Sequence, residues 1–180
     1  MKHAELKAVS LPTPLAYLIT FTCYGTRLHG DEAGSVDHFH NIPGSPYLPP
    51  DIVRRSTEQW LMKERADELD TQRRAVVLSA IREARFHKGW KVLAVHVRRK
   101  HIHVVVAAPE TPEKVLNHFK SYASRALNQA AIDDGKRTRG THHGSTRYLW
   151  KPQQVRAAVE YVVYGQGRPM AVWKRTEPPW

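Results

Sequence analysis

The chain has a single cysteine and no long uninterrupted run of apolar residues. Cys23 has no partner for an internal disulfide, and its isolation excludes a metal site built from several cysteines, which is typical of a reducing compartment. It stands in the apolar-rich segment 17–24, which favours a buried thiol over a nucleophile. No segment reaches the ~18 apolar residues of a membrane span, and the N-terminus lacks the apolar region of a signal peptide. These absences predict a cytoplasmic protein without membrane contact.

Acidic residues are also scarce, since 17 Asp and Glu face 28 Lys and Arg and leave a net charge of +11. Within residues 85–151 there are 14 Lys and Arg but only 4 acidic residues, so most of the excess lies in the middle of the chain. A basic region of this kind attracts phosphate backbones, although an inert solvated surface is the alternative. At 180 residues we expect one domain over 1–180, long enough to bury a core.

Apolar periodicity predicts strands and helices in the order β, α, β, β, α, β, α. The order favours an α+β fold of the ferredoxin-like kind, an antiparallel sheet with helices packed on one face. Residues 25–50 are rich in Gly and Pro and predict a long irregular loop, and the charged segment 51–70 predicts a helix. The predicted strands are 15–24, two within 92–106, and 146–150, and the predicted helices are 71–87, 112–130 and 152–164.

The second strand of the central hairpin begins with His-Ile-His. Residues two apart on a strand share a face, so His101 and His103 point the same way and can clamp a divalent metal. The turn before them carries Arg98, Arg99 and Lys100, which favours a polyanionic substrate. A pair of strand histidines alone is more often an ordinary surface feature. The same spacing at residues 38 and 40 falls in the Gly/Pro-rich loop, where no strand fixes its geometry, and we interpret it as a loop feature.

A metal beside a phosphodiester makes the phosphorus more electrophilic, but a nucleophile is still required. Water would give hydrolysis, whereas a side-chain hydroxyl would give a covalent intermediate. Tyr161 lies roughly 130° from the centre of the apolar stripe of the last predicted helix, and Tyr164 lies nearly opposite that stripe. Either tyrosine is a candidate nucleophile, and an exposed amphipathic tyrosine is the alternative for both.

Three separated segments resemble the HUH single-tyrosine transposases, which include those of small insertion sequences and the REP-associated tyrosine transposases. Residues 19–31 resemble the family's first strand and following loop, and residues 100–106 match its His-hydrophobic-His strand. Residues 160–167 resemble its late helix in the form Tyr-Val-x-x-Gly-Gln-Gly. The resemblance spans roughly residues 15–172.

The resemblance implies that His101 and His103 bind Mg²⁺ or Mn²⁺ while Tyr161 attacks a phosphodiester of single-stranded or hairpin DNA. The products would be a 5′-phosphotyrosine and a free 3′-hydroxyl, which can later rejoin strands. The family also implies a homodimer, in which the tyrosine helix of one subunit often completes the site of the other. A transposase or transposase-derived enzyme is thus expected, with Tyr161 favoured over Tyr164 by the motif.

The third metal ligand departs from the family pattern. Insertion-sequence members often have a metal-binding Gln four residues after the tyrosine, where this chain has Gly165, and Gln166 follows at plus five. Gln166 reaches the metal if Gly165 ends the helix in a left-handed turn. Gln154, on the face of Tyr161, is a less favoured substitute.

Basic residues in three segments are candidate DNA contacts, with a solvated surface as the alternative for each. Two further functions remain open: a related replication-initiation or relaxase-like nuclease, and a basic nucleic-acid-binding module without catalysis. The candidate DNA contacts are Arg98, Arg99, Lys100, Lys120, Arg125, Lys136, Arg137 and Arg139.

Overall fold

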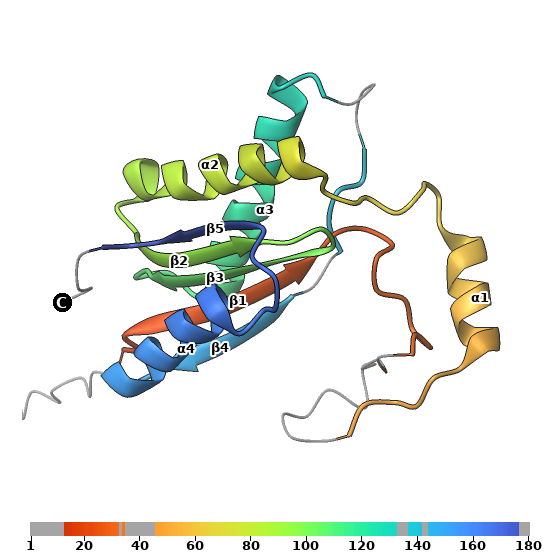
Figure 1. The fold of residues 1–180 in the computed structure, drawn as a ribbon, viewed down its shortest axis with the longest axis horizontal. Helices are drawn as coiled ribbons and strands as arrows, with labels where there is room; N and C mark the ends of the chain where they lie inside the picture. The colour runs from red at the N-terminus through yellow and green to blue at the C-terminus, as the bar shows by residue number, and fades with distance from the viewer. Residues whose placement is uncertain (1–12, 33, 35–45, 133–136, 142–143, 177–180) are drawn as a thin grey trace, which may run out of the picture.

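A computed structural model describes residues 13–32, 34, 46–132, 137–141 and 144–176. Its strands form one five-stranded sheet in the order β4-β1-β3-β2-β5, and all neighbouring pairs are antiparallel (Figure 1). The elements are β1 (Ala16–Thr22), α1 (Ile52–Leu61), α2 (Thr71–Lys88), β2 (Lys91–Val97), β3 (His101–Ala107), α3 (Pro112–Gln129), β4 (Ser145–Leu149), α4 (Pro152–Tyr164) and β5 (Ala171–Lys174). The α+β class and its antiparallel sheet are confirmed.

The helices begin and end where their capping residues require. The Asp70 carboxylate accepts a hydrogen bond from the Arg73 amide at the start of α2, as an N-cap residue does. Gly89 ends α2 with φ +67°, a left-handed conformation that glycine adopts without a steric penalty. Proline occupies the first turn of both α3 and α4, where its missing amide hydrogen costs no intrahelical bond.

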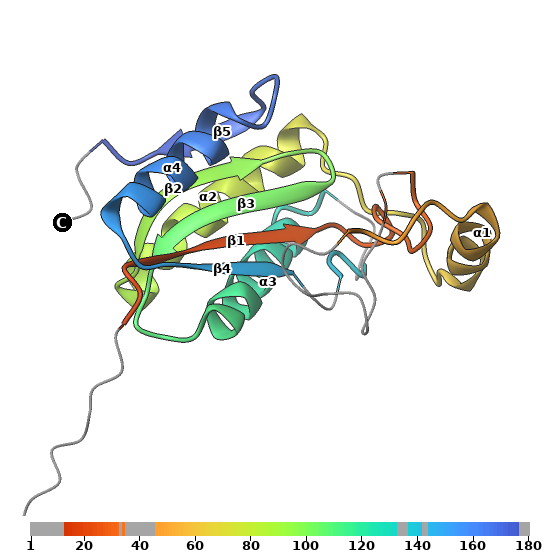
Figure 2. The same ribbon diagram turned by 90° about the horizontal axis from the view of Figure 1, so that it is seen from below.

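The two faces of the sheet are covered by different helices. Helices α2 and α3 pack on one face over a continuous core that includes Ile19, Val104 and Phe119. Helix α4 packs on the opposite face over a smaller core that includes Val105 and Val162 (Figure 2). The expectation that all helices lie on one face is therefore wrong for α4, because its apolar stripe meets a second apolar patch on the other side of the sheet.

Helix α1 and strand β5 complete the described fold. Helix α1 stands away from the sheet and buries none of its residues, while Trp60 is exposed at its surface (Figure 1). Strand β5 pairs with β2 and forms one edge of the sheet. In the part of the chain that the structure describes, no helix has both the length and the apolar character needed to cross a bilayer.

Candidate functional site

A row of polar side chains crosses three neighbouring strands on the face that α4 covers. Thr20 of β1 is paired with His103 of β3, and His103 is paired with His96 of β2. Side chains that lie opposite each other in register project from the same face of a sheet. His101, two residues before His103, shares this face. The sheet therefore presents three imidazoles and a hydroxyl toward α4.

His101 and His103 lie together, as their spacing predicts, with ring centroids 4.8 Å apart and an angle of 82° between the rings. Thr20 Oγ1 lies 2.8 Å from His103 Nδ1. The other ring nitrogen of His103, Nε2, is buried without a hydrogen bond of normal geometry. An imidazole whose Nδ1–H donates to Thr20 keeps its Nε2 lone pair for a metal, which is the usual arrangement around a metal-bound histidine.

Both histidines are held in the neutral form that a metal ligand needs. Burial is the main cause that lowers the pKa of His103 to about 4, and the neighbouring His101, His96 and Arg98 contribute to the same shift. Burial also lowers the pKa of His101, with Arg98 as the next cause. Protons therefore do not compete for these nitrogens at neutral pH.

Helix α4 brings Tyr161 of the same chain to the histidine pair. The Tyr161 ring centroid lies 5.9 Å from that of His103, and the side chain is 47% exposed, so a substrate can reach it. Tyr164 is 70% exposed, and its ring lies 5.9 Å from the Lys174 ammonium. Of the two candidate nucleophiles, Tyr161 is the one in contact with the histidines.

His96 attaches the end of α4 and the following turn to the sheet. Its side chain is fully buried, its Nδ1 lies 3.0 Å from the carbonyl oxygen of Val162, and its Nε2 accepts a hydrogen bond from the Met170 amide at 3.2 Å. Nε2 accepts, so the proton is on Nδ1 and is donated to Val162. Burial lowers the pKa of His96 and keeps this neutral tautomer. His96 thus fixes the residue next to Tyr161.

Gln166 returns toward the site through a turn that differs from the expected one. Gly165 has φ −82°, so the left-handed turn that would direct Gln166 to the metal does not form there, and Gly167 has the positive φ of +72° instead. The Gln166 amide donates to the Tyr161 carbonyl at 3.4 Å, and the Gln166 side chain opposes the fall in the pKa of His103 because a protonated His103 would donate a hydrogen bond to it. Gln154 is engaged elsewhere, because its Oε1 accepts the Trp150 and Lys151 amides at the start of α4.

The candidate metal ligands are two imidazoles and one amide oxygen. Within the described ranges no group of three or more His, Cys, Asp or Glu side chains lies close enough to hold a metal. The Nε2 of His103 is buried without a hydrogen bond of normal geometry, which fits a metal ligand, and Gln166 is near enough to add an oxygen. Imidazole and amide oxygen donors with open positions for water or phosphate fit a divalent ion such as Mn²⁺ or Mg²⁺.

The candidate DNA contacts in the hairpin and in α3 differ in exposure. Arg99 and Lys100 are exposed and both pair with Glu68, with Lys100 Nζ 3.5 Å from its carboxylate. Arg98 donates to the Arg168 carbonyl at 3.2 Å. On α3, Arg125 is exposed above the Tyr122 ring, whereas Lys120 is half-buried and donates to the Thr141 carbonyl at 2.7 Å.

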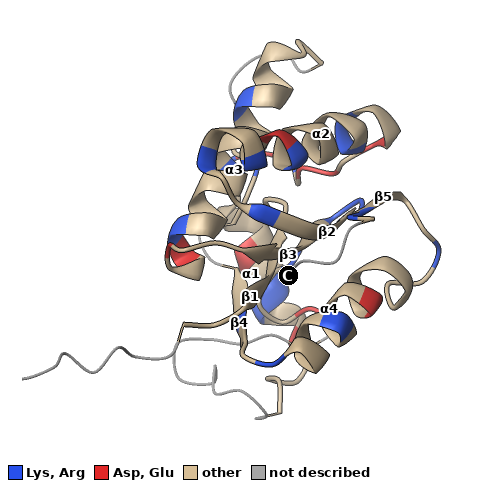
Figure 3. Ribbon diagram, turned by 90° about the vertical axis from the view of Figure 1, so that its left-hand side faces the viewer, with Lys and Arg blue, Asp and Glu red and all other residues tan. Residues whose placement is uncertain are grey.

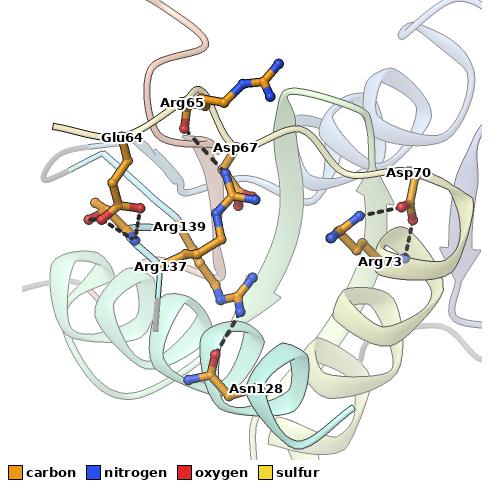
Figure 4. A network of polar contacts seen from close by, with 9 residues as sticks. Glu64, Arg65, Asp67, Asp70, Arg73, Asn128, Arg137 and Arg139 are labelled. Carbon is orange, nitrogen blue, oxygen red and sulfur yellow. Dashed lines mark hydrogen bonds and ion pairs between the residues drawn. The ribbon is translucent and has the colours of Figure 1, made fainter. Parts of the chain in front are cut away.

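The candidate contacts at 137–139 belong to a polar network between chain segments that are distant in sequence (Figure 4). Arg139 is buried and donates to the Asn128 side chain at 2.7 Å. Arg137 lies 3.8 Å from the buried carboxylate of Asp67 and donates to the Arg65 carbonyl. Lys136 lies outside the described residues, as does the histidine pair at residues 38 and 40.

Cys23 lies beside this network and is buried, as expected from its apolar surroundings. Burial is the main cause that raises the pKa of its thiol to about 12, and the charge of Asp67 contributes to the same shift. A thiol with this pKa stays protonated at neutral pH, which excludes a thiolate nucleophile.

Cationic residues are spread over several elements. Figure 3 shows Lys and Arg positions on α2, α3 and α4, and an acidic position on α4 as well. Helix α4 carries one Arg and one Glu and adds no net charge, whereas Lys and Arg outnumber Asp and Glu on α2 and on α3. The attraction of the helices for a polyanion therefore comes from the side of the sheet that α2 and α3 cover.

Comparison with known proteins identifies the family. The family described as IS200-like transposases matches residues 59–163, which is more than half of the chain. A solved structure of a REP-associated tyrosine transposase bound to a REP hairpin aligns with a TM-score of 0.47 and 11% identity, covering 91% of this chain and 72% of that chain. No curated protein sequence matches this chain.

The chain belongs to the IS200-like transposase family, within the HUH single-tyrosine transposases that its motifs resemble. Its function is accordingly that of a DNA-processing transposase.

Proposed function

We propose that this chain cleaves and rejoins single-stranded or hairpin DNA through a covalent bond to Tyr161, with a divalent metal held by His101 and His103. The observation that carries the proposal is the contact of the Tyr161 ring with His103, whose buried Nε2 has no hydrogen bond of normal geometry. This contact supports the proposal, because a nucleophile at Tyr161 and a metal on His103 would flank a single position that a phosphodiester can occupy.

His101, His103 and the Gln166 amide would hold Mg²⁺ or Mn²⁺. The bound ion would supply Lewis-acid chemistry by withdrawing charge from a non-bridging phosphate oxygen. Thr20 orients the His103 ring through its hydrogen bond to Nδ1, and burial keeps both imidazoles neutral.

In the first step Tyr161 Oη bonds to the phosphorus and loses its proton, while the bond from phosphorus to the 3′ oxygen breaks. The 3′ oxygen leaves and takes up a proton, so the products are a 5′-phosphotyrosine and a 3′-hydroxyl. The energy of the phosphodiester is kept in the tyrosyl ester, and attack by a 3′-hydroxyl reverses the step without an external energy source.

We propose further that one chain carries a complete site, since α4 brings Tyr161 to the histidines of its own chain. A homodimer remains a prediction. The site could be completed within one chain or by the tyrosine helix of a partner subunit. Mixing the Tyr161→Phe protein with the His103→Ala protein and supplying hairpin DNA distinguishes these two arrangements. A complete site in each chain predicts no covalent adduct from the mixture, and an adduct would show that the tyrosine helix is exchanged between subunits.

The nucleic-acid contacts are assigned first to Arg99, Lys100 and Arg125, whose side chains are exposed. Arg98, Lys120, Lys136, Arg137 and Arg139 remain candidates. Arg98, Lys120, Arg137 and Arg139 have partners within the chain, so each would contact a phosphate in addition to that partner or after releasing it.

The experiment that tests this function uses labelled hairpin oligonucleotides from the DNA that flanks the gene, with Mn²⁺ or with EDTA. The protein, Tyr161→Phe and Tyr164→Phe are compared on a denaturing gel. We expect a metal-dependent, SDS-resistant adduct with the unaltered protein and with Tyr164→Phe, and none with Tyr161→Phe. Salt-dependent binding without any adduct, across several flanking sequences, would instead support a non-catalytic nucleic-acid-binding module.

A further inference from the structure

An open groove of about 590 Å³ lies between α4 and the strands β1 and β4. Leu18, Leu149 and Ala158 contribute apolar surface to it, and Arg147 and Gln153 contribute polar groups. Arg147 shares a face of the sheet with its register partner Leu18, so it lies on the side that α4 covers. The groove is thus built from the open edge strand of the sheet and the helix that carries the nucleophile.

The groove reaches the reacting groups. Thr20 and Tyr161 both line it, and these two residues contact His103 from different elements. A DNA strand whose scissile phosphate lies between His103 and Tyr161 continues on at least one side of that phosphate. The groove offers that continuation a path that begins at Tyr161.

The lining has the chemistry of a site for an unpaired nucleotide. Apolar side chains provide a surface for the face of a base, and the Gln153 amide has both a donor and an acceptor for a base edge. The Arg147 guanidinium is exposed and has no partner among the residues that the structure describes, so it is available to a phosphate. Gln154 also lines the groove, but its carbonyl oxygen is engaged by two backbone amides.

We propose that this groove binds the unpaired DNA next to the scissile phosphate, with a base against Leu18 and Ala158 and a backbone phosphate on Arg147. The inference rests on the proposed function, because it takes Tyr161 as the position of the scissile phosphate. It adds a defined binding site for one flank of the cleavage position.

Binding to fluorescein-labelled oligothymidylate in EDTA tests the groove without requiring chemistry. Ala157 is exposed and lines the groove, so Ala157→Trp fills it from the surface. Arg147→Gln removes the charge at the groove, and Arg156→Gln removes an exposed charge from α4 outside the groove. Circular dichroism and melting temperature establish that each variant is folded, and Gln153→Ala replaces Ala157→Trp if the latter is not.

We expect Ala157→Trp and Arg147→Gln to weaken binding by about fivefold to tenfold, and Arg156→Gln by less than about twofold. Arg147→Gln should also reduce the salt slope of binding by about one, the effect of a lost phosphate contact. The same fivefold to tenfold weakening is expected of Gln153→Ala where it replaces Ala157→Trp. The proposal is overturned if whichever of these two variants is used is folded and binds like the unaltered protein, or if Arg156→Gln weakens binding as much as Arg147→Gln.

A second experiment determines which DNA flank contacts Arg147. It measures adduct formation with hairpins whose single-stranded flank is shortened at one end or at the other. The difference between Arg147→Gln and the unaltered protein should disappear when one flank is removed and persist when the other is removed. A difference that survives both truncations would assign Arg147 to the hairpin stem and contradict the proposal. An adduct that persists in Tyr161→Phe would refute the proposed nucleophile without changing the oligothymidylate result.

Discussion

The two faces of one sheet differ in what covers them. The face under α2 and α3 is a continuous apolar layer in which Ile19, Val104 and Phe119 are fully buried. The face under α4 is apolar near one end and polar near the other, where the row of Thr20, His103 and His96 crosses the strands. One helix covers less of a sheet than two, which leaves the groove between α4 and the strands β1 and β4, next to the candidate site.

The difference indicates that residues that stabilise the fold and residues of the candidate site project from opposite faces of the same strands. Neighbouring residues on β3 point to opposite faces, so a packing residue and a site residue are adjacent in sequence. Substitutions on the two faces should therefore affect different measurements.

The largest loss of stability is expected on the packed face. Phe119 is fully buried, with its ring 5.4 Å from that of Trp90. Phe119→Ala should lower the free energy of unfolding by about 3–5 kcal/mol, because it removes apolar surface and leaves a cavity. Urea denaturation measures this loss, and Phe119→Leu serves if the alanine variant does not fold. A loss below about 1 kcal/mol would contradict the assignment of this face as the main core.

The adjacent residues His103 and Val104 sharpen the comparison. His103→Ala should reduce the rate of adduct formation at least about 100-fold, which corresponds to about 2.7 kcal/mol, because a metal ligand is lost. Val104→Ala should lower stability by about 2 kcal/mol and leave the rate within about threefold. Single-turnover gel assays and urea denaturation provide the two readouts. Equal effects of both substitutions on the rate would contradict the assignment of different roles to the two faces of the sheet.

His96 is expected to affect both stability and the rate of adduct formation. Its side chain is buried, and it also holds the end of α4, which carries Tyr161. His96→Ala leaves the Val162 carbonyl unpaired, which should cost about 1–3 kcal/mol of stability and slow adduct formation about tenfold. His96→Asn can keep the bond to Val162, and His96→Gln can keep the bond to the Met170 amide. If His96 positions Tyr161, His96→Asn should restore the rate more than His96→Gln does. Rates that follow stability alone across the three variants would exclude a positioning role.

The smallest effect is a dependence of stability on pH. His103 has a pKa of about 4 in the folded chain against an ordinary 6.5, so the unfolded chain takes up a proton between these values that the folded chain does not. Its contribution to stability is complete above about pH 6.5 and is lost as the pH falls toward 4, by of order 1 kcal/mol at about pH 5. The free energy of unfolding is measured by urea denaturation in EDTA at about pH 7 and about pH 5. It should fall less between these two pH values for His103→Gln than for the unaltered protein. An equal or larger fall in the variant would contradict the burial of His103.

Local sequence patterns predicted the elements well. The predicted helices 71–87, 112–130 and 152–164 agree with α2, α3 and α4 to within one residue at each end. The alternation of side chains on β3 was sufficient to place His101 and His103 together. These features depend on residues within a few positions of one another.

Contacts between distant segments were not predicted. Thr20 meets His103 across 83 positions of sequence, and the burial of Arg139 depends on its contact with Asn128 of α3. His96 was detectable in principle, because the register of the basic hairpin pairs it with His103. The edge strand β5 and the separation of α1 from the sheet depend on tertiary packing that periodicity does not describe.

The central claim is that Tyr161 is the residue that bonds to DNA, and mapping the covalent link tests it most directly. The adduct formed with Mn²⁺ is digested with nuclease and trypsin, and the peptide that contains both Tyr161 and Tyr164 is fragmented in a mass spectrometer. The account predicts a residual nucleotide phosphate on Tyr161. A phosphate on Tyr164, or on any other residue, would contradict it.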